Sequence, residues 1–151
     1  MKKLVLLALF AASLTISTSV TPAQGEAPAD HAYTFGPVMV VSFVRTQPGM
    51  FEQYMSYLDS TYKRVLEEFK KQGIILDYAV YSARPRDPQD ADVILTVKYK
   101  NMAAFDDLQS RSDPVVKQVF GSLSKASSAS ADREKLRRDL GSQEVRQLIL
   151  K

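Results

Sequence analysis

The side chains that most often carry out catalysis are scarce in this chain. It contains no cysteine and a single histidine, His31. Thiol chemistry and a Cys-His pair are therefore excluded, and a Ser-His-Asp triad would need His31 to fold back into a site. No second histidine or any cysteine could complete a metal site with it. We expect His31 to be an exposed linker residue.

Three carboxylates lie close together in one polar segment, at Asp87, Asp90 and Asp92. Carboxylates bind hard cations, but this spacing does not match the pattern of a calcium-binding loop. We interpret the segment as a solvated loop and expect no metal site there. No glycine-rich phosphate loop appears elsewhere in the chain.

The remaining polar residues of interest are embedded in apolar patterns. The candidate ligand-binding residues are phenols and cations on the predicted strands and first helix, namely Arg45, Tyr54, Tyr57, Tyr78, Tyr81 and Lys98, accompanied by Tyr62 and Tyr99. An apolar cavity with a few phenols and one cation is a common small-molecule pocket. Tyrosine also fills cores and subunit interfaces while its hydroxyl reaches water, which is the alternative interpretation. The pattern identifies no catalytic residue and implies no cofactor.

Periodicity predicts the elements that position these residues. Residues 38–44 form a continuous apolar, β-branched run, as expected for a strand covered on both faces. Apolar residues at three- and four-residue steps predict a helix from about Gly49 to Gln72, with Pro48 near its start and Gly73 as its cap. Two further strands are predicted at residues 74–83 and 93–99, joined by a polar loop that contains Pro85 and Pro88.

The second half of the chain predicts a helix and a last strand. Asn101 is a suitable N-cap for a helix that carries Phe105 and Leu108, and Asp113-Pro114 is expected to restart that helix. Residues 122–132 indicate a surface loop or a weak helix, and residues 133–140 a short charged helix. The run 145–150 predicts a strand. The order β-α-β-β-α-β predicts an α+β, ferredoxin-like sandwich with an antiparallel four-stranded sheet.

The N-terminus has the pattern of a secretory signal. A basic start is followed by an apolar run that is too short to span a bilayer, and then by small polar residues. We expect a signal peptide at 1–23, a linker at 24–37 and one domain at 38–151. Loss of two lysines with the signal lowers the formal charge from +3 to +1. The mature protein is thus expected to be exported to the periplasm or medium, without stable membrane insertion, and it gives no indication of a nucleic-acid partner.

Three stretches carry a family resemblance: QPGMFEQYMSYL, VILTVKYKNMAAFDDL and SDPVVKQVF. With the strand before the first of them, they resemble the dimeric α/β-barrel superfamily, which includes NIPSNAP-like, EthD-like and antibiotic-biosynthesis-monooxygenase-like domains. The resemblance implies a homodimer that pairs sheet to sheet around an open barrel. Some members are cofactor-free oxygenases and others bind or degrade haem. Haem-degrading relatives use Asn, Trp and His in the pocket, whereas this chain has no tryptophan and no pocket histidine.

The sequence leaves three functions open. The first is an exported homodimer that binds a small apolar or aromatic ligand between sheet and helices. The second is a cofactor-free monooxygenase or isomerase acting on aromatic or polyketide-like substrates. The third is a non-catalytic structural or protein-interaction module whose sheet face serves only as an interface.

Overall fold

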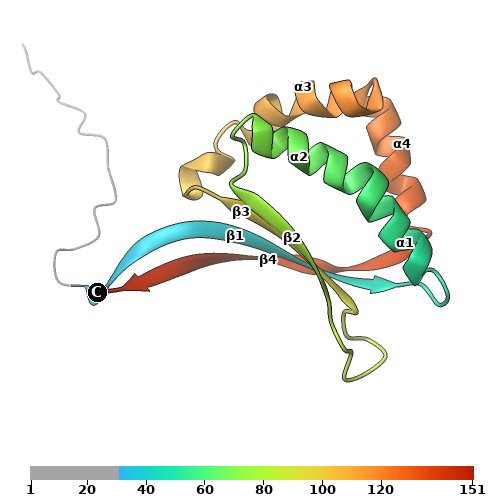
Figure 1. Ribbon diagram of the computed structural model, residues 1–151, viewed down its shortest axis with the longest axis horizontal. Coiled ribbons are helices and arrows are strands. Elements are labelled where there is room, and N and C mark those ends of the chain that lie inside the picture. The colour runs from blue at the N-terminus through green and yellow to red at the C-terminus, as the bar shows by residue number, and fades with distance from the viewer. Residues whose placement is uncertain (1–30) are drawn as a thin grey trace, which may run out of the picture. The chain divides into compact units, whose positions relative to one another are not determined.

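The computed structural model describes residues 31–151 (Figure 1). The predicted signal peptide and the first part of the predicted linker lie outside these residues. The described chain forms, in order, β1 (Tyr33–Thr46), α1 (Phe51–Tyr57), a π-helical segment (Leu58–Tyr62), α2 (Lys63–Lys71), β2 (Asp77–Ser82), β3 (Val93–Tyr99), a 3-10 turn (Met102–Phe105), α3 (Leu108–Phe120), α4 (Leu123–Arg133) and β4 (Arg137–Leu150).

The four strands form one antiparallel sheet in the order β2-β3-β1-β4. All the helices cover the same face of this sheet, as Figure 1 shows. The predicted ferredoxin-like α+β fold with a four-stranded antiparallel sheet is therefore confirmed. We call the uncovered side of the sheet the open face, and the side beneath the helices the helical face.

The first helical stretch matches its prediction closely. α1, the π-helical segment and α2 follow one another without a break from Phe51 to Lys71. The stretch ends where Gly73 adopts a positive φ of 69°, which glycine allows without steric cost. The amide of Ile74 then donates to the carbonyl of Phe69, which satisfies a carbonyl at the helix end.

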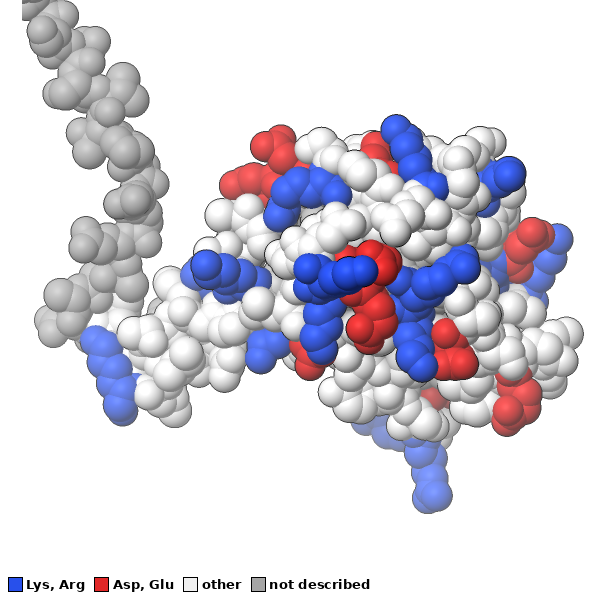
Figure 2. Space-filling model, turned by 45° about the horizontal axis from the view of Figure 1, so that its top comes forward, with Lys and Arg blue, Asp and Glu red and all other residues white. Residues whose placement is uncertain are grey.

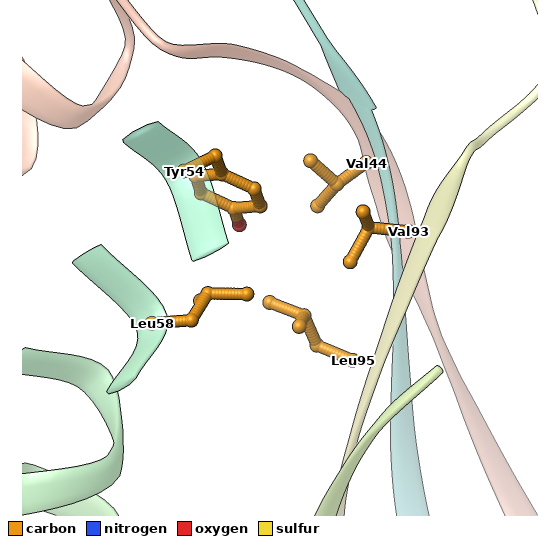
Figure 3. Packing of buried hydrophobic residues seen from close by; sticks show 5 residues of the cluster. All are labelled: Val44, Tyr54, Leu58, Val93 and Leu95. Carbon is orange, nitrogen blue, oxygen red and sulfur yellow. The ribbon is translucent and has the colours of Figure 1, made fainter. Parts of the chain in front are cut away.

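The core lies between the helices and the sheet in two clusters. In the first, Tyr54 and Leu58 from the helical stretch face Val44, Val93 and Leu95 from the sheet (Figure 3). The second gathers Leu66, Ile74, Ile75 and Val115. Both clusters use the apolar stripe that the helical periodicity predicts, so the faces of β1, β3 and the first helices follow from the sequence.

Two predicted features of the second half are wrong. α3 continues through Asp113-Pro114 instead of restarting there. Leu108, Val115 and Val119 on either side of Pro114 all pack on the second cluster, and this packing outweighs the backbone hydrogen bond that a proline removes. Residues 137–140 are strand and not a charged helix. The helix lies earlier, at Leu123–Arg133, where the Ser122 hydroxyl caps it by accepting from the amide of Lys125 at 3.1 Å.

The first and last strands, β1 and β4, are longer than predicted. β1 begins at Tyr33 and so includes the end of the predicted linker, where it pairs with the last residues of β4. Figure 1 shows this pair of strands extending beyond the helices toward the C-terminus. Its exposed apolar residues include Phe35, Leu148, Ile149 and Leu150. We call this pair the β1–β4 arm. Within residues 31–151 no helix is long and apolar enough to cross a membrane.

A β-bulge in β4 decides which side chains of that strand face the helices. Phe43 pairs with Gly141 and Val44 pairs with Asp139, so Leu140 is the extra residue. Because strand side chains alternate, one extra residue exchanges the two faces beyond it. Arg137 and Asp139 therefore share the helical face with Ser142. In a regular strand, odd-numbered and even-numbered residues would lie on opposite faces. Gly141 supports the bulge with a φ of 105°.

We predict that Gly141→Ala destabilises the protein by about 1–3 kcal/mol, because an alanine at this positive φ is strained. No heavy atom lies within 4 Å of the position that the new methyl group would take, so backbone strain is the only expected cost. Urea unfolding followed by circular dichroism measures the change. Glu144→Ala, an exposed position of the same strand on the helical face, is the matched control and should stay within about 0.5 kcal/mol of the parent. Equal stability of the two variants would show that the bulge does not need glycine.

Candidate functional site

A cavity of about 240 Å³, partly open to solvent, lies between the helical face of the sheet and the helices. We call it the internal cavity. Its wall combines apolar groups, phenols and charged groups from five parts of the chain, namely Ser42, Tyr54, Tyr57, Leu58, Tyr62, Leu95, Val97, Arg133, Arg137 and Asp139. It adjoins the first core cluster, which contributes Tyr54, Leu58 and Leu95.

The π-helical segment contributes two of these lining residues. Tyr54, Leu58 and Tyr62 follow one another at four-residue steps and all line the cavity. In a regular helix of 3.6 residues per turn each such step overshoots a full turn by about 40°. The wider π turn at Leu58–Tyr62 reduces this drift, so all three side chains face the sheet. π turns inside helices are often found at functional sites.

The tyrosines of the cavity are held by packing. The rings of Tyr54 and Tyr57 stack with centroids 6.2 Å apart and an angle of 9° between their planes. The Tyr54 side chain is completely buried. Burial raises its pKa, although the nearby Arg137 and Arg133 act in the opposite direction. Burial likewise raises the pKa of Tyr62. Both phenols therefore stay protonated near neutral pH and present O–H donors.

The charged wall comes from the end of α4 and the start of β4. Arg137 is only 5% exposed, and its guanidinium lies 3.0 Å from carboxylate oxygens of both Glu134 and Asp139. Arg133 lies 3.6 Å from Glu134 and donates to the Ser130 hydroxyl at 3.0 Å. Burying an arginine is costly unless carboxylates pair with it, and Glu134 and Asp139 supply that pairing for Arg137.

Three buried polar atoms at this cavity have no hydrogen-bond partner. They are the hydroxyl oxygen of Tyr54 and the Nε atoms of Arg133 and Arg137. A buried donor without a partner costs about 1–3 kcal/mol, and native proteins contain few of them. Three unpaired groups on residues that line one small cavity mark it as the place where a bound acceptor would be most stabilised.

The residues predicted from sequence divide among three places. Tyr54 and Tyr57 line the internal cavity. Tyr78 lies on the same sheet face but outside the cavity, where its hydroxyl donates to Glu67 at 2.6 Å. Burial and this carboxylate raise the pKa of Tyr78 to about 12. By the strand register, Tyr81 and Lys98 lie on the open face. Arg45 lies at the end of the sheet, 4.0 Å from Asp92.

Sequence reasoning missed Arg133, Arg137 and Asp139. They fall in a segment whose composition favours a charged surface helix, and only the bulge turns Arg137 and Asp139 inward. The signal in the sequence is weak: two cations and a carboxylate, from Arg137 to Asp139, stand shortly before Gly141. Ser42 was also missed, because a serine within an apolar strand carries no distinctive pattern.

The predicted aspartate loop is held by hydrogen bonds within the protein. Asp92 accepts from the amide and the hydroxyl of Thr46 at 2.9 and 2.5 Å. Asp90 accepts from the amide of Arg86, and Asp87 from the amide of Gln89. These bonds close the loop onto itself and onto β1. In the part of the chain that the structure describes, no three His, Cys, Asp or Glu residues are grouped so that they could hold a metal ion.

Comparisons with known proteins identify the fold and nothing finer. No family model and no curated protein match this chain. Among solved structures, HapK from Hahella chejuensis aligns with a TM-score of 0.50 at 10% identity, covering 73% of this chain and 91% of HapK. Two structures described as dimeric ferredoxin-like proteins from uncultured marine organisms align with TM-scores of 0.47. The first is 14% identical, and the alignment covers 76% of this chain and 97% of the other. The second is 8% identical, and the alignment covers 78% of this chain and 90% of the other. The likeness to HapK supports the ferredoxin-like fold alone.

Proposed function

We propose that this chain is an exported, homodimeric protein that binds a small aromatic or apolar ligand in the internal cavity. The observation that carries the proposal is the set of three unpaired buried polar atoms, on Tyr54, Arg133 and Arg137, at one cavity of about 240 Å³. These atoms are themselves shielded from solvent, so the side chains around the cavity must move for the acceptors of a ligand to reach them. Such a ligand would complete the hydrogen bonding of Tyr54 and Arg137 and strengthen that of Arg133, whose Nε atom now lies 3.6 Å from Glu134.

The lining defines the chemistry of this ligand. Two of the unpaired groups are N–H donors on guanidinium ions and the third is a phenol that can donate, so the complementary group is an acceptor such as a carboxylate, an enolate or a phenolate. Leu58, Leu95 and Val97 offer an apolar wall for the rest of the molecule. The cavity is smaller than the pockets of roughly 300–1,000 Å³ that hold drug-sized ligands, which favours a compact molecule such as a single substituted ring.

The protonation of the tyrosines supports binding in preference to proton abstraction. Tyr54 and Tyr62 have raised pKa values and act as donors. The carboxylate of the cavity, Asp139, is already paired with Arg137 at 3.0 Å. The phenols are thus donors, and the carboxylate is engaged by a guanidinium. We therefore propose binding without an assigned reaction.

The open face of the sheet supports a homodimer. Its middle carries apolar side chains from three strands, among them Met39, Val41, Phe43, Ile94 and Val145, and no helix covers them; Thr96, Lys98 and Gln143 lie between them. An uncovered apolar surface bordered by polar residues is typical of an interaction site. A second copy brings the same surface, as a two-fold interface requires. The family resemblance implies the same sheet-to-sheet pairing. Export rests on the signal pattern of residues 1–23 alone.

We predict that Tyr54→Phe stabilises the ligand-free protein by about 1 kcal/mol, because it removes a buried hydroxyl that has no partner. The same change should reduce the amount of ligand that co-purifies with the mature protein. Thermal unfolding measures the first effect. Native mass spectrometry of protein purified from its own periplasm or medium measures the second.

Tyr78→Phe is the matched control for this experiment. It removes a hydroxyl that is hydrogen-bonded to Glu67 outside the cavity, so it should not raise stability and should leave ligand retention unchanged. Protein that carries no extra mass in either form, together with a loss of stability in Tyr54→Phe, would contradict a ligand site at Tyr54.

We predict that Val41→Asp converts the dimer into a monomer, because it places a charge at the centre of the open face, where it would lose its water on pairing. Gln53→Asp introduces the same charge at an exposed position of α1 and should leave the dimer intact. Size-exclusion chromatography with light scattering gives the mass of each variant. A parent protein that is monomeric at all concentrations would refute pairing through this face.

A further inference from the structure

A second hollow, of about 480 Å³, lies at the end of the sheet where β1 meets the β2–β3 loop and the start of β4. We call it the end hollow. Two arginines, Arg45 and Arg138, line it together with one carboxylate, Asp92. The side chains of Pro48, Phe51 and Pro88 add an apolar part to its wall. It shares no lining residue with the internal cavity.

The two arginines are directly opposite each other in the sheet. Arg45 on β1 pairs with Arg138 on β4 in the antiparallel register, and both side chains belong to the open face. Like charges at directly opposed positions repel each other and destabilise a sheet. Such a pair needs either a compensating anion or a carboxylate between the two guanidinium groups.

The protein compensates these charges only in part. Arg45 lies 4.0 Å from Asp92 and donates to the carbonyl of Asp90 over a long 3.4 Å. The Asp92 carboxylate is meanwhile engaged by the amide and the hydroxyl of Thr46. Arg138 donates at 2.6 Å to the side-chain oxygen of Gln89, which is neutral. The hollow therefore holds an excess of positive charge, with guanidinium N–H groups still free to donate.

We propose that the end hollow binds a small organic phosphate. A carboxylate fills the fork of one guanidinium, whereas the terminal oxygens of a phosphate monoester can accept from two guanidinium groups on different sides. Arg45 and Arg138 supply those two groups. The organic part of the ligand lies against the apolar part of the wall, formed by Pro48, Phe51 and Pro88.

This site is independent of the proposed ligand in the internal cavity. The consecutive residues Arg137 and Arg138 point to opposite faces of β4, the first into the internal cavity and the second into the end hollow. Substitution of Arg138 consequently leaves Tyr54, Arg133 and Arg137 in place. Failure of phosphate binding at Arg138 would not affect the proposal for the internal cavity, and the reverse also holds.

The test is a titration of the ¹⁵N-labelled mature protein with phenyl phosphate, inorganic phosphate and benzoate, followed by amide chemical shifts. We expect phenyl phosphate to shift the amides of Thr46, Gln47, Gly49 and Gln89 saturably, and to bind more tightly than the other two. Arg138→Gln should weaken its binding about tenfold, since a hydrogen bond between charged groups is lost. Arg45→Gln should act in the same direction.

Arg84→Gln is the matched control, because it removes the same charge from an exposed side chain that does not line the hollow. It should leave the affinity unchanged. An equal loss in Arg84→Gln and Arg138→Gln would show general charge attraction and overturn the proposal. Shifts confined to other parts of the protein, or no saturable binding, would also overturn it. Tighter binding of benzoate or inorganic phosphate than of phenyl phosphate would contradict the assignment to an organic phosphate.

Discussion

The arrangement of charges around Arg137 is the interaction on which the interior of this protein depends. A guanidinium enclosed between a sheet and a helical layer is tolerated only when carboxylates offset the loss of its water. Glu134 and Asp139 do so, and they lie on opposite sides of the turn between α4 and β4. The pairing therefore fixes where α4 ends and how β4 enters the sheet. It also keeps a polar wall next to a core that is otherwise built from valine and leucine.

This constraint explains why a cavity persists beside a well-packed cluster. Val44, Val93 and Leu95 are buried in the first cluster, and Tyr54 and Leu58 cover them from the helical side (Figure 3). Apolar side chains in place of Arg133 and Arg137 would extend the same packing across the sheet. The guanidinium groups interrupt this apolar packing, since they cannot approach apolar neighbours without losing their carboxylate partners. On the helical side shown in Figure 2, basic and acidic residues are interspersed. The described residues of this surface therefore form no large patch of one charge.

The elements that could be predicted from the sequence are those in which apolar residues recur at a regular spacing. The helix that contains Tyr54 and the strand that contains Val44 follow from apolar spacing, and together with β2 and β3 they determine the fold. The position of Arg137 does not follow, because it depends on a single extra residue at Leu140 that exchanges the two faces of a strand. The π turn at Leu58 is equally invisible to a pattern of 3.6 residues. Pro114 misled the prediction, since long-range packing outweighed a local signal. Two tyrosines of the site could be predicted, whereas its cations required tertiary structure.

The β1–β4 arm has a consequence for the behaviour of the chain in concentrated solution. β4 is an outer strand of the sheet, and most of its length is protected against pairing with foreign strands by charged residues and by the bulge. The last residues of β4 lack this protection, since Leu148, Ile149 and Leu150 are exposed and uncharged. In Figure 2 the region of the arm is largely free of charged residues. Within residues 31–151, edge-to-edge strand addition along β4 is therefore least opposed at Leu148, Ile149 and Leu150.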